Sequence, residues 1–195
     1  PINSWDNVVL QSGKAYLQKC GSEAILENRL VTPSNILLGA YGTGPRPLIR
    51  VTESLQGDRA AIEAGSTQVT IRDLHIEAPA LSSVIRLGAS QTIVYNCELA
   101  LARWGMRGYG ENYTIRRNII REIKDDGLFL QNASNIDLGW NYIFRVNTLW
   151  EDPYTPQTIA GGDSVQLERC RDVSVHHNVF DRTSSGNKFG LISNN

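Results

Sequence analysis

Residues 127–143 read GLFLQNASNIDLGWNYI, and this stretch holds the pattern that decides the fold. It contains a first apolar segment at 128–130, a second apolar position at Leu138, and Asn141 three residues later. Copies of the first segment lie at 61–64, 84–87, 105–108, 127–130, 164–167 and 190–193, and copies of the second position are Ile71, Val94, Ile115, Leu138 and Val175. A unit repeated at such a period cannot bury its apolar face alone, so the units are expected to stack into a solenoid.

Each repeating unit, or rung, is expected to consist of short β-strands. Apolar and polar residues alternate over three to five positions in each copy, and the i, i+3, i+4 spacing of an amphipathic helix is absent. Successive first segments begin 21 to 26 residues apart, except for one interval of 37 between Leu128 and Val165. The pattern predicts an all-β solenoid with about 22–24 residues per rung.

Three asparagines occupy the same place in successive rungs: Asn118, Asn141 and Asn178. Asparagine tolerates left-handed backbone conformations and hydrogen-bonds to nearby backbone groups, so it favours a sharp corner between strands. Because stacked strands repeat every ~4.8 Å, identical amides can also bond to one another along the stack. Leu74 and Cys97 fill this place in the earlier rungs, so the ladder of amides is expected to begin at Asn118.

These Ile-x-x-Asn-x-Ile corners, together with DGLFLQNASNI at 126–136, resemble the right-handed parallel β-helix superfamily typified by pectate lyases. Residues 10–21 and 36–49 resemble the first rungs of secreted bacterial members that act on polysaccharides. The resemblance implies a single parallel β-helix domain over 1–195, with opening rungs at 1–59 and regular rungs at 61–193. It also implies that a polysaccharide lies in a groove along the first sheet, and that the protein is secreted, exposed at the cell surface or periplasmic.

The composition of the chain bounds its partners. Its 195 residues include 19 Lys and Arg against 20 Asp and Glu, so there is no basic excess to attract nucleic acid or an anionic membrane surface. No apolar stretch is long enough to span a bilayer. A new rung opens at Gly190, five residues before Asn195, and an open solenoid end exposes strand edges. We therefore expect these residues to be part of a longer protein.

Alternation along the first segment of each rung divides its residues between core and surface. The outward positions, which line the expected groove, are Glu63, Arg86, Arg107, Phe129 and Gln166. Arg86 and Arg107 are on adjacent rungs, where two guanidinium groups suit the carboxylates of a uronic acid polymer. We expect Arg86 and Gln166 to bind substrate and Arg107 to act in catalysis. A structural alternative pairs the two arginines with Glu63, Glu98 or Glu122.

Acidic residues precede the first segment on two successive rungs, at Asp126 and Asp163, with Asp125 beside the first of them. The backbones of residues one rung apart are ~5 Å apart, so the distance between two carboxylates there falls in the range found between the catalytic pair of glycosidases. Asp126 and Asp163 are therefore expected to be catalytic. Two alternatives stay open. The three carboxylates could bind Ca²⁺, which prefers oxygen ligands, or cap the turn that enters the strand. The expected cofactor is accordingly none, or Ca²⁺.

One rung is longer than the others, because 22 residues separate Asn141 from Asp163, against 8 in the preceding rung. The 14 extra residues predict a loop at 146–162 that leaves the solenoid and covers the groove. Its Trp150 and Tyr154 carry flat rings suited to stacking on sugars, so both are expected to bind substrate. The alternative is a loop that only covers the side of the solenoid.

The histidines are not expected in the site. His176 and His177 precede the corner at Asn178, and adjacent residues of a strand point to opposite faces, which argues against joint metal binding. His75 lies beyond a corner, away from the expected groove.

Together these features favour a carbohydrate-active enzyme that cleaves an acidic polysaccharide. A lyase must neutralise the uronate carboxylate, by Arg or Ca²⁺, and needs a base for the proton at C5, for which Lys124 and Tyr109 are further available groups. A hydrolase would use Asp126 and Asp163 as acid and base or nucleophile. The alternative from another class is a non-catalytic solenoid: an adhesin, a phage tail-spike segment or a glycan-binding module.

Overall fold

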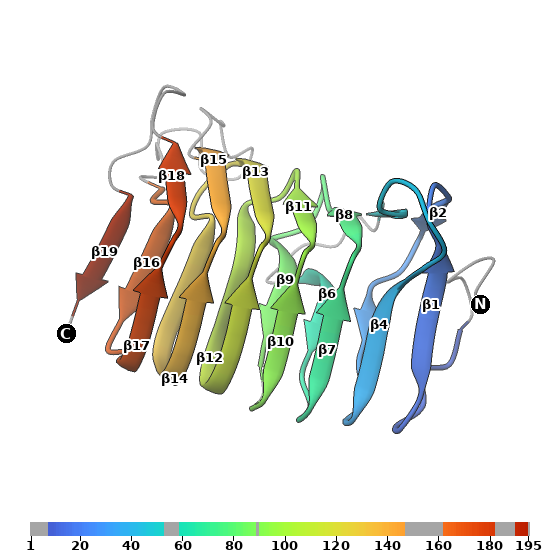
Figure 1. Cartoon of the computed structure of the whole chain (residues 1–195), viewed down its shortest axis with the longest axis horizontal. Coiled ribbons are helices and arrows are strands. Elements are labelled where there is room, and N and C mark those ends of the chain that lie inside the picture. The colour runs from blue at the N-terminus through green and yellow to red at the C-terminus, as the bar shows by residue number, and fades with distance from the viewer. Residues whose placement is uncertain (1–7, 53–58, 89, 147–161, 182–189, 195) are drawn as a thin grey trace.

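The computed structural model of the protein describes residues 8–52, 59–88, 90–146, 162–181 and 190–194. Every regular element in these ranges is a β-strand, and all of the strand pairs are parallel. The rungs stack in chain order from one end of the molecule to the other (Figure 1). The predicted all-β solenoid is confirmed, and the described residues include no helix able to cross a membrane.

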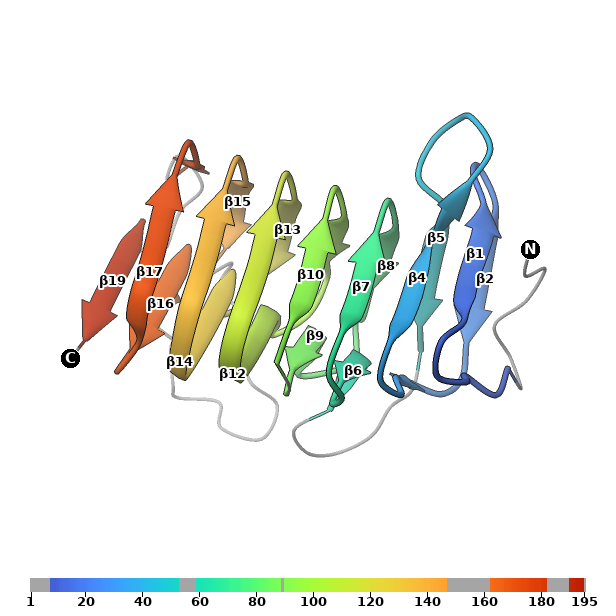
Figure 2. The ribbon, with the colours of Figure 1, turned by 60° about the horizontal axis from the view of Figure 1, so that its bottom comes forward.

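The strands form three faces, seen from two directions in Figures 1 and 2. The first face contains β3 (Leu30–Val31), β6 (Ala60–Ala64), β9 (Ser83–Leu87), the first parts of β12 (Trp104–Arg116) and β14 (Leu128–Gly139), β16 (Val165–Glu168) and β19 (Leu191–Asn194). The second face contains β1 (Ala15–Lys19), β4 (Ile36–Tyr41), β7 (Val69–Arg72), β10 (Thr92–Tyr95), the last parts of β12 and β14, and β17 (Arg171–His176). The third face contains β2 (Glu23–Leu26), β5 (Leu48–Val51), β8 (His75–Glu77), β11 (Glu98–Ala100), β13 (Ile119–Ile123), β15 (Tyr142–Val146) and β18 (Val179–Asp181).

Strands β12 and β14 run across the corner between the first and second faces, so these faces form one sheet of 12 strands, and the third face is a sheet of seven. The core lies between the faces. The inward positions predicted for the first face are all at most 3% exposed: Ile62, Ile85, Leu87, Met106, Leu128, Leu130, Val165 and Leu167. Burial of these aliphatic side chains, rung after rung, is the main favourable term in folding.

The predicted ladder of amides is present at the corner between the second and third faces. The Nδ2 of Asn118 donates to Oδ1 of Asn141 at 3.0 Å, and the Nδ2 of Asn141 donates to Oδ1 of Asn178 at 3.0 Å. Each side chain also bonds to two backbone groups of the preceding rung. In Asn141, Nδ2 donates to the carbonyl of Ile115 at 2.9 Å, and Oδ1 accepts the backbone N–H of Asn118 at 3.0 Å. Asn118 and Asn141 are 1% and 4% exposed, so these bonds are shielded from water.

The ladder ends at Cys97, as the sequence predicts. The backbone N–H of Cys97 donates to Oδ1 of Asn118 at 2.9 Å. The Cys97 thiol lies 3.6 Å from the carbonyl of Ile71. The side chain of Asn118 bonds to the equivalent carbonyl on the next rung, that of Val94. Complete burial raises the pKa of this thiol to about 12, so Cys97 is a neutral filler of the corner.

One reason given for the asparagines is wrong. The left-handed residue at this corner is the one before the ladder asparagine: φ is 58° at Arg117, 55° at Trp140 and 55° at His177. None of the three ladder asparagines has a positive φ. The asparagine therefore serves the corner through its side-chain hydrogen bonds, while its neighbour takes the left-handed turn at a cost of about 1 kcal/mol or more.

Replacing Asn141 with Ala should lower the free energy of unfolding by roughly 1–3 kcal/mol, because two buried backbone groups of the preceding rung, the carbonyl of Ile115 and the N–H of Asn118, lose their partner. Denaturant unfolding of the variant measures the change. Asn194→Ala, at an exposed strand position, is the matched control and should change stability by at most about 0.5 kcal/mol. Equal stabilities for the wild type and the Asn141 variant would contradict the role given to the ladder.

Candidate functional site

Asp125, Asp126 and Asp163 lie together where the chain passes from the third face to the first. The backbone N–H of Gly105 donates to the carbonyl of Asp126 at 3.1 Å, and that of Gly127 donates to the carbonyl of Asp163 at 2.9 Å. These bonds place Asp126 and Asp163 in the same position of successive rungs, as the sequence predicts.

The glycine after Asp126 keeps the two rungs in this close contact. A Cβ atom on Gly127 would lie 2.6 Å from the carbonyl oxygen of Ser164 and 2.8 Å from Cγ2 of Ile143. Any side chain here would therefore force the rungs apart. Close packing of the rungs beside the acidic cluster therefore requires glycine at position 127.

The two stacked carboxylates do not splay outward as expected. Instead, Oδ1 of Asp126 accepts the backbone N–H of Asp163 at 2.8 Å. Asp125, Asp126 and Asp163 are 8%, 5% and 4% exposed, so all three are buried acidic residues. Asp126 thus has the turn-capping contact of the structural alternative, and its carboxyl group also hydrogen-bonds to the side chain of Trp104.

Burial changes the acidity of the cluster. It raises the pKa of Asp126 to about 7, and the neighbouring charge of Asp125 adds to the rise, while the hydrogen bond from the Asp163 backbone opposes it. Burial also raises the pKa of Asp125, against the opposing effect of Arg103, whose Nε lies 3.1 Å from Oδ2 of that carboxylate. Near neutral pH, Asp126 is therefore divided between its protonated and ionised forms.

A stack of cationic and aromatic side chains borders the cluster on the first face. The guanidinium carbons of Arg103 and Arg107 lie 4.1 and 4.6 Å from the ring centroid of Trp104, and that of Arg107 lies 5.8 Å from the ring of Phe129. Such contacts hold the arginine heads in place. Arg107 also lowers the pKa of Asp125 from its burial-raised value, so its charge is felt within the cluster.

Arg103 was missed at the sequence level. A signal was available, because Arg103 and Asp125 are 22 residues apart, one rung period, and the backbone N–H of Asp125 donates to the carbonyl of Arg103 at 2.8 Å. Residues one period apart lie next to each other on stacked rungs, so a separation of 22 in the sequence gives a direct contact. The Glu98–Arg121 ion pair at 2.7 Å, also about one period apart, has the same origin.

The outward column of the first face is confirmed by the strand register. Glu63 pairs with Arg86, Arg86 with Arg107, Arg107 with Phe129, and Phe129 with Gln166. Two members have other contacts: Glu63 forms an ion pair with Arg29 at 3.4 Å, and the amide of Gln166 donates to Glu168 at 2.8 Å. Of the other carboxylates suggested as arginine partners, Glu98 pairs with Arg121 and Glu122 with Arg145.

The other expectation for the three carboxylates is a Ca²⁺ site. Across the described ranges, no group of three or more Asp, Glu, His or Cys side chains is arranged to hold a metal ion. One oxygen of Asp126 is bound to a backbone N–H and one of Asp125 to Arg103, so part of the donor set is engaged within the protein. A Ca²⁺ ion at the acidic cluster stays a prediction.

Most of the predicted 146–162 loop, with Trp150 and Tyr154, lies outside the described residues. Its two described ends are Val146, the last residue of β15, and Gly162. A Cβ on Gly162 would lie 2.2 Å from the carbonyl oxygen of Asp125, so the chain re-enters the solenoid directly against the acidic cluster.

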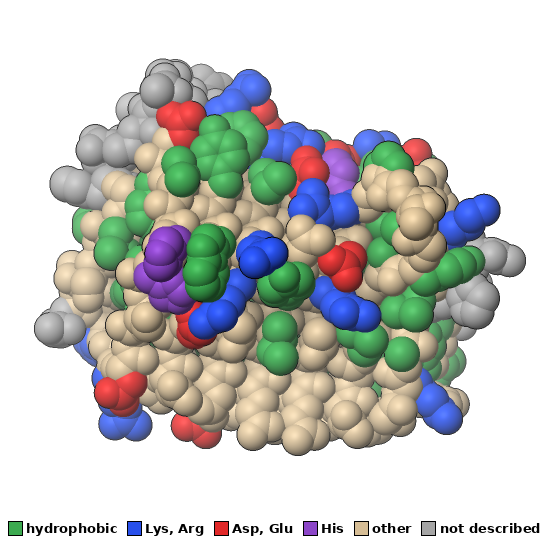
Figure 3. All heavy atoms as spheres, in the orientation of Figure 1, with side chains coloured by type: hydrophobic (Ala, Val, Ile, Leu, Met, Phe, Trp, Pro, Cys, Tyr) green, Lys and Arg blue, Asp and Glu red, His purple; other side chains and the backbone are tan. Residues whose placement is uncertain are grey.

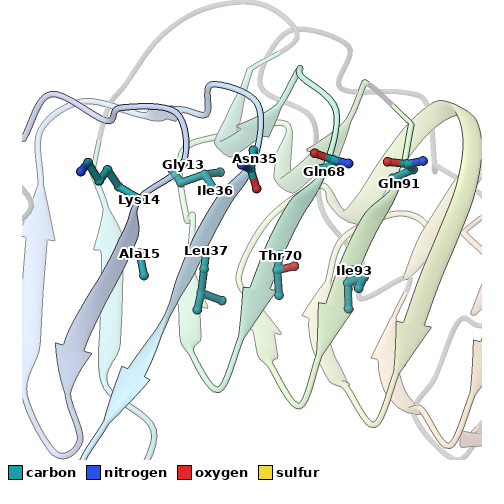
Figure 4. A pocket seen from close by; sticks show the side chains of 10 residues that line it. All are labelled: Gly13, Lys14, Ala15, Asn35, Ile36, Leu37, Gln68, Thr70, Gln91 and Ile93. Carbon is teal, nitrogen blue, oxygen red and sulfur yellow. The ribbon is translucent and has the colours of Figure 1, made fainter.

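A separate hollow of about 470 Å³ lies on the second face near the N-terminal rungs. Figure 4 shows Asn35, Gln68 and Gln91 in a row above Leu37, Thr70 and Ile93, one pair per rung. Lys14 is the one charged residue of its lining, which also includes Gly13, Ala15 and Ile36. Without a carboxylate this hollow offers no acid–base chemistry, but its amides both donate and accept hydrogen bonds.

A family model described as "right handed beta helix region" matches residues 60–194. No curated protein and no solved structure matches the chain. The matched range includes the acidic cluster, the outward column and the amide ladder.

Asp126→Asn should abolish a pH-dependent loss of stability. The pKa of Asp126 is raised on folding, so its stabilising contribution is complete below the unfolded pKa and is lost as the pH rises through about 7. The wild type should lose roughly 1–3 kcal/mol of unfolding free energy through this group between about pH 4 and about pH 8. Asn retains the oxygen that accepts the Asp163 N–H, so the variant should lack this loss.

Urea unfolding at a series of pH values measures the difference. Asp172→Asn, which removes an exposed carboxylate on the second face, should retain the wild-type pH profile. If the wild type and the Asp126 variant gave parallel profiles, Asp126 would have an ordinary pKa.

Proposed function

Because this chain belongs to the right-handed β-helix family, we propose that it cleaves glycosidic bonds of an acidic, uronate-containing polysaccharide at the Asp126 corner. The observation that carries the proposal is the buried carboxyl group of Asp126, which hydrogen-bonds to the side chain of Trp104 in the cationic and aromatic stack; burial raises its pKa to about 7. A perturbed carboxyl group of this kind marks a candidate acid–base catalyst.

Asp126 has the role of proton donor. Glycoside cleavage needs a proton on the leaving oxygen, whether the reaction is hydrolysis or β-elimination. A carboxyl group with a pKa near neutrality donates that proton and accepts one in return within each cycle. Its Oδ1 is held by the Asp163 backbone at 2.8 Å, so the carboxyl plane is fixed before substrate binds.

Arg107 has the role of binding and neutralising the uronate carboxylate. It is on the outward column of the first face, and its guanidinium group is held by Trp104 and Phe129. A guanidinium group binds carboxylate through two parallel hydrogen bonds, and the adjacent rings offer apolar surface for a sugar face. Arg86, its neighbour on the preceding rung, extends this surface along the solenoid toward a second uronate unit.

The remaining groups serve the two possible reactions. In hydrolysis, Asp163 or Asp125 is the second carboxylate that assists water or the anomeric carbon. In elimination, the base that removes the C5 proton is Lys124, whose pKa is lowered by burial and which is therefore more readily neutral. The resemblance to pectate lyases favours such a substrate, and we propose with it a secreted or cell-surface location, where the polymer would be met.

Incubation with polygalacturonate, alginate and a glucuronate polymer tests the proposal. Unsaturated products absorb in the ultraviolet and report elimination, whereas new reducing ends without that absorbance report hydrolysis. Asp126→Asn should lower turnover at least about a hundredfold, while Asp172→Asn should retain it. Absence of cleavage of every polymer by the folded wild type, or full activity of Asp126→Asn, would end the proposal.

The role of Arg107 is separable from that of Asp126. Arg107→Gln should lower kcat/KM about 10- to 100-fold on the free-acid polymer, because the paired hydrogen bonds to the carboxylate are lost. The same variant should have little effect on the methyl-esterified polymer, which has no carboxylate to bind. An equal loss on both polymers would show that Arg107 does not recognise the charge.

A second function is favoured by the hollow on the second face. Its row of amides above an aliphatic floor suits the hydroxyl groups of a neutral glycan that runs along the solenoid, as in a non-catalytic glycan-binding module. Ile93→Arg should abolish such binding by filling the hollow with charge, and it should leave cleavage at Asp126 unchanged. Calorimetric titration with neutral oligosaccharides that shows no heat, for the wild type as for the variant, would remove this candidate.

A further inference from the structure

His176 and His177 lie side by side on the surface, contrary to the sequence-based expectation. Adjacent strand residues point to opposite faces, but His177 is the left-handed corner residue, with φ at 55°. The turn ends the alternation and brings the two rings to the same side, with their Nδ1 atoms 3.0 Å apart. The argument against a joint role for these histidines therefore fails, because the strand ends at His176.

A carboxylate on the preceding rung sets the proton position of His176. Oδ1 of Asp137 lies 2.9 Å from Nε2 of His176, and the same carboxylate accepts a hydrogen bond from Arg116. The ion pair with Arg116 keeps this carboxylate ionised, so it can only accept hydrogen bonds. Nε2 of His176 must then carry the proton, so in the neutral ring Nδ1 is an acceptor, and Nδ1 of His177 donates to it at 3.0 Å.

Neighbouring groups hold both rings in place. The Trp140 ring is stacked on His177, with centroids 4.9 Å apart and planes 11° apart, and it meets His176 edge-on at 4.6 Å. A Cβ on Gly139 would lie 2.5 Å from Cε1 of His176, so only glycine leaves room for this ring. Figure 3 shows the two purple histidine rings in contact with a hydrophobic side chain on this face. The pair is preorganised.

We propose that His176 and His177 bind one divalent transition-metal ion through their two Nδ1 atoms, with Asp137 as the positioning residue behind His176. Metal–nitrogen bonds of about 2.0–2.1 Å place neighbouring ligand nitrogens about 3 Å apart, and the observed separation is 3.0 Å. When solvent moves the proton of His177 from Nδ1 to Nε2, both Nδ1 atoms have lone pairs, and a small rotation of either ring turns them toward a common ion. A carboxylate on the far nitrogen is the usual support of a metal-binding histidine.

The chemistry of the pair selects the ion. Imidazole nitrogens suit Cu²⁺, Ni²⁺ and Zn²⁺ and do not suit Ca²⁺ or Mg²⁺, and affinity is greatest for Cu²⁺. In the described part of the chain no third Asp, Glu, His or Cys joins the two histidines, so water completes the coordination. The ion is on the second face, away from the acidic cluster, and is independent of the proposed cleavage.

Titration of the folded protein with Cu²⁺ tests the proposal. Trp140 is stacked on a ligand, so bound Cu²⁺ should quench its fluorescence at one equivalent. Trp140→Phe should remove this quenching and still bind the ion by calorimetry. His176→Gln and His177→Gln should each abolish the one-to-one binding, and glutamine already occupies left-handed positions at 68 and 91 in this fold. His75→Gln, on the third face, is the matched control and should bind as the wild type does.

Asp137→Asn separates positioning from ligation. It should weaken binding about 10- to 100-fold without abolishing it, because both ligands remain. Electron paramagnetic resonance of the wild-type Cu²⁺ complex should show two nitrogen ligands. This measurement uses the wild type alone, so it holds even if a variant fails to fold. A spectrum with one or no nitrogen ligand, or Cu²⁺ binding that survives loss of either histidine, would overturn the proposal.

Discussion

The structure depends on rungs that stay in register at the corner between the second and third faces. There, the side chain of each ladder asparagine bonds to two backbone groups of the preceding rung, and the amides of Asn118, Asn141 and Asn178 bond to one another. In a buried position, losing one of these bonds would leave several backbone groups unpaired. A slip of one residue would also turn every core side chain of a strand toward solvent. The ladder and the aliphatic core thus specify the same register.

The candidate site follows from that register. Stacking converts a separation of one rung in the sequence into direct contact, and it does so at every corner. It sets Asp126 beneath the backbone of Asp163, Asp125 beside Arg103, and Arg107 between Trp104 and Phe129. The same mechanism places Asp137 behind His176 on another face. Chemistry in this solenoid is therefore assembled from residues about 22 to 40 positions apart, each held by its own strand.

Much of this arrangement could be predicted, because the sequence shows both the length of the repeat and the alternation of apolar and polar residues within each rung. The shared slot of Asp126 and Asp163, the outward column from Glu63 to Gln166 and the start of the ladder at Asn118 all follow from aligning the rungs. The family match over residues 60–194 agrees with this fold.

What could not be predicted depends on backbone angles and burial at single residues. Left-handed φ values fall on Arg117, Trp140 and His177, and the repeat pattern marks none of these residues as the one that turns, so the pairing of His176 with His177 was missed. The inward turn of Asp126 rests on a side-chain to backbone bond that no pattern of residue types encodes, and the burial that accompanies it raises the pKa to about 7. Arg103 was partly predictable. Its ion-pair partner Asp125 is one repeat period away in the sequence, but its contact with the Trp104 ring is not visible in the repeat pattern.

A double-mutant cycle on Asn118 and Asn141 tests most directly whether the ladder couples the rungs. Asn118→Ala, Asn141→Ala and the double variant would be unfolded in denaturant, and the three losses of free energy compared with one another. Since Nδ2 of Asn118 bonds to Oδ1 of Asn141 at 3.0 Å, the account predicts a coupling energy of at least about 0.5 kcal/mol. Losses that add to within about 0.3 kcal/mol would show two independent corners and contradict the ladder as the element that keeps the rungs in register.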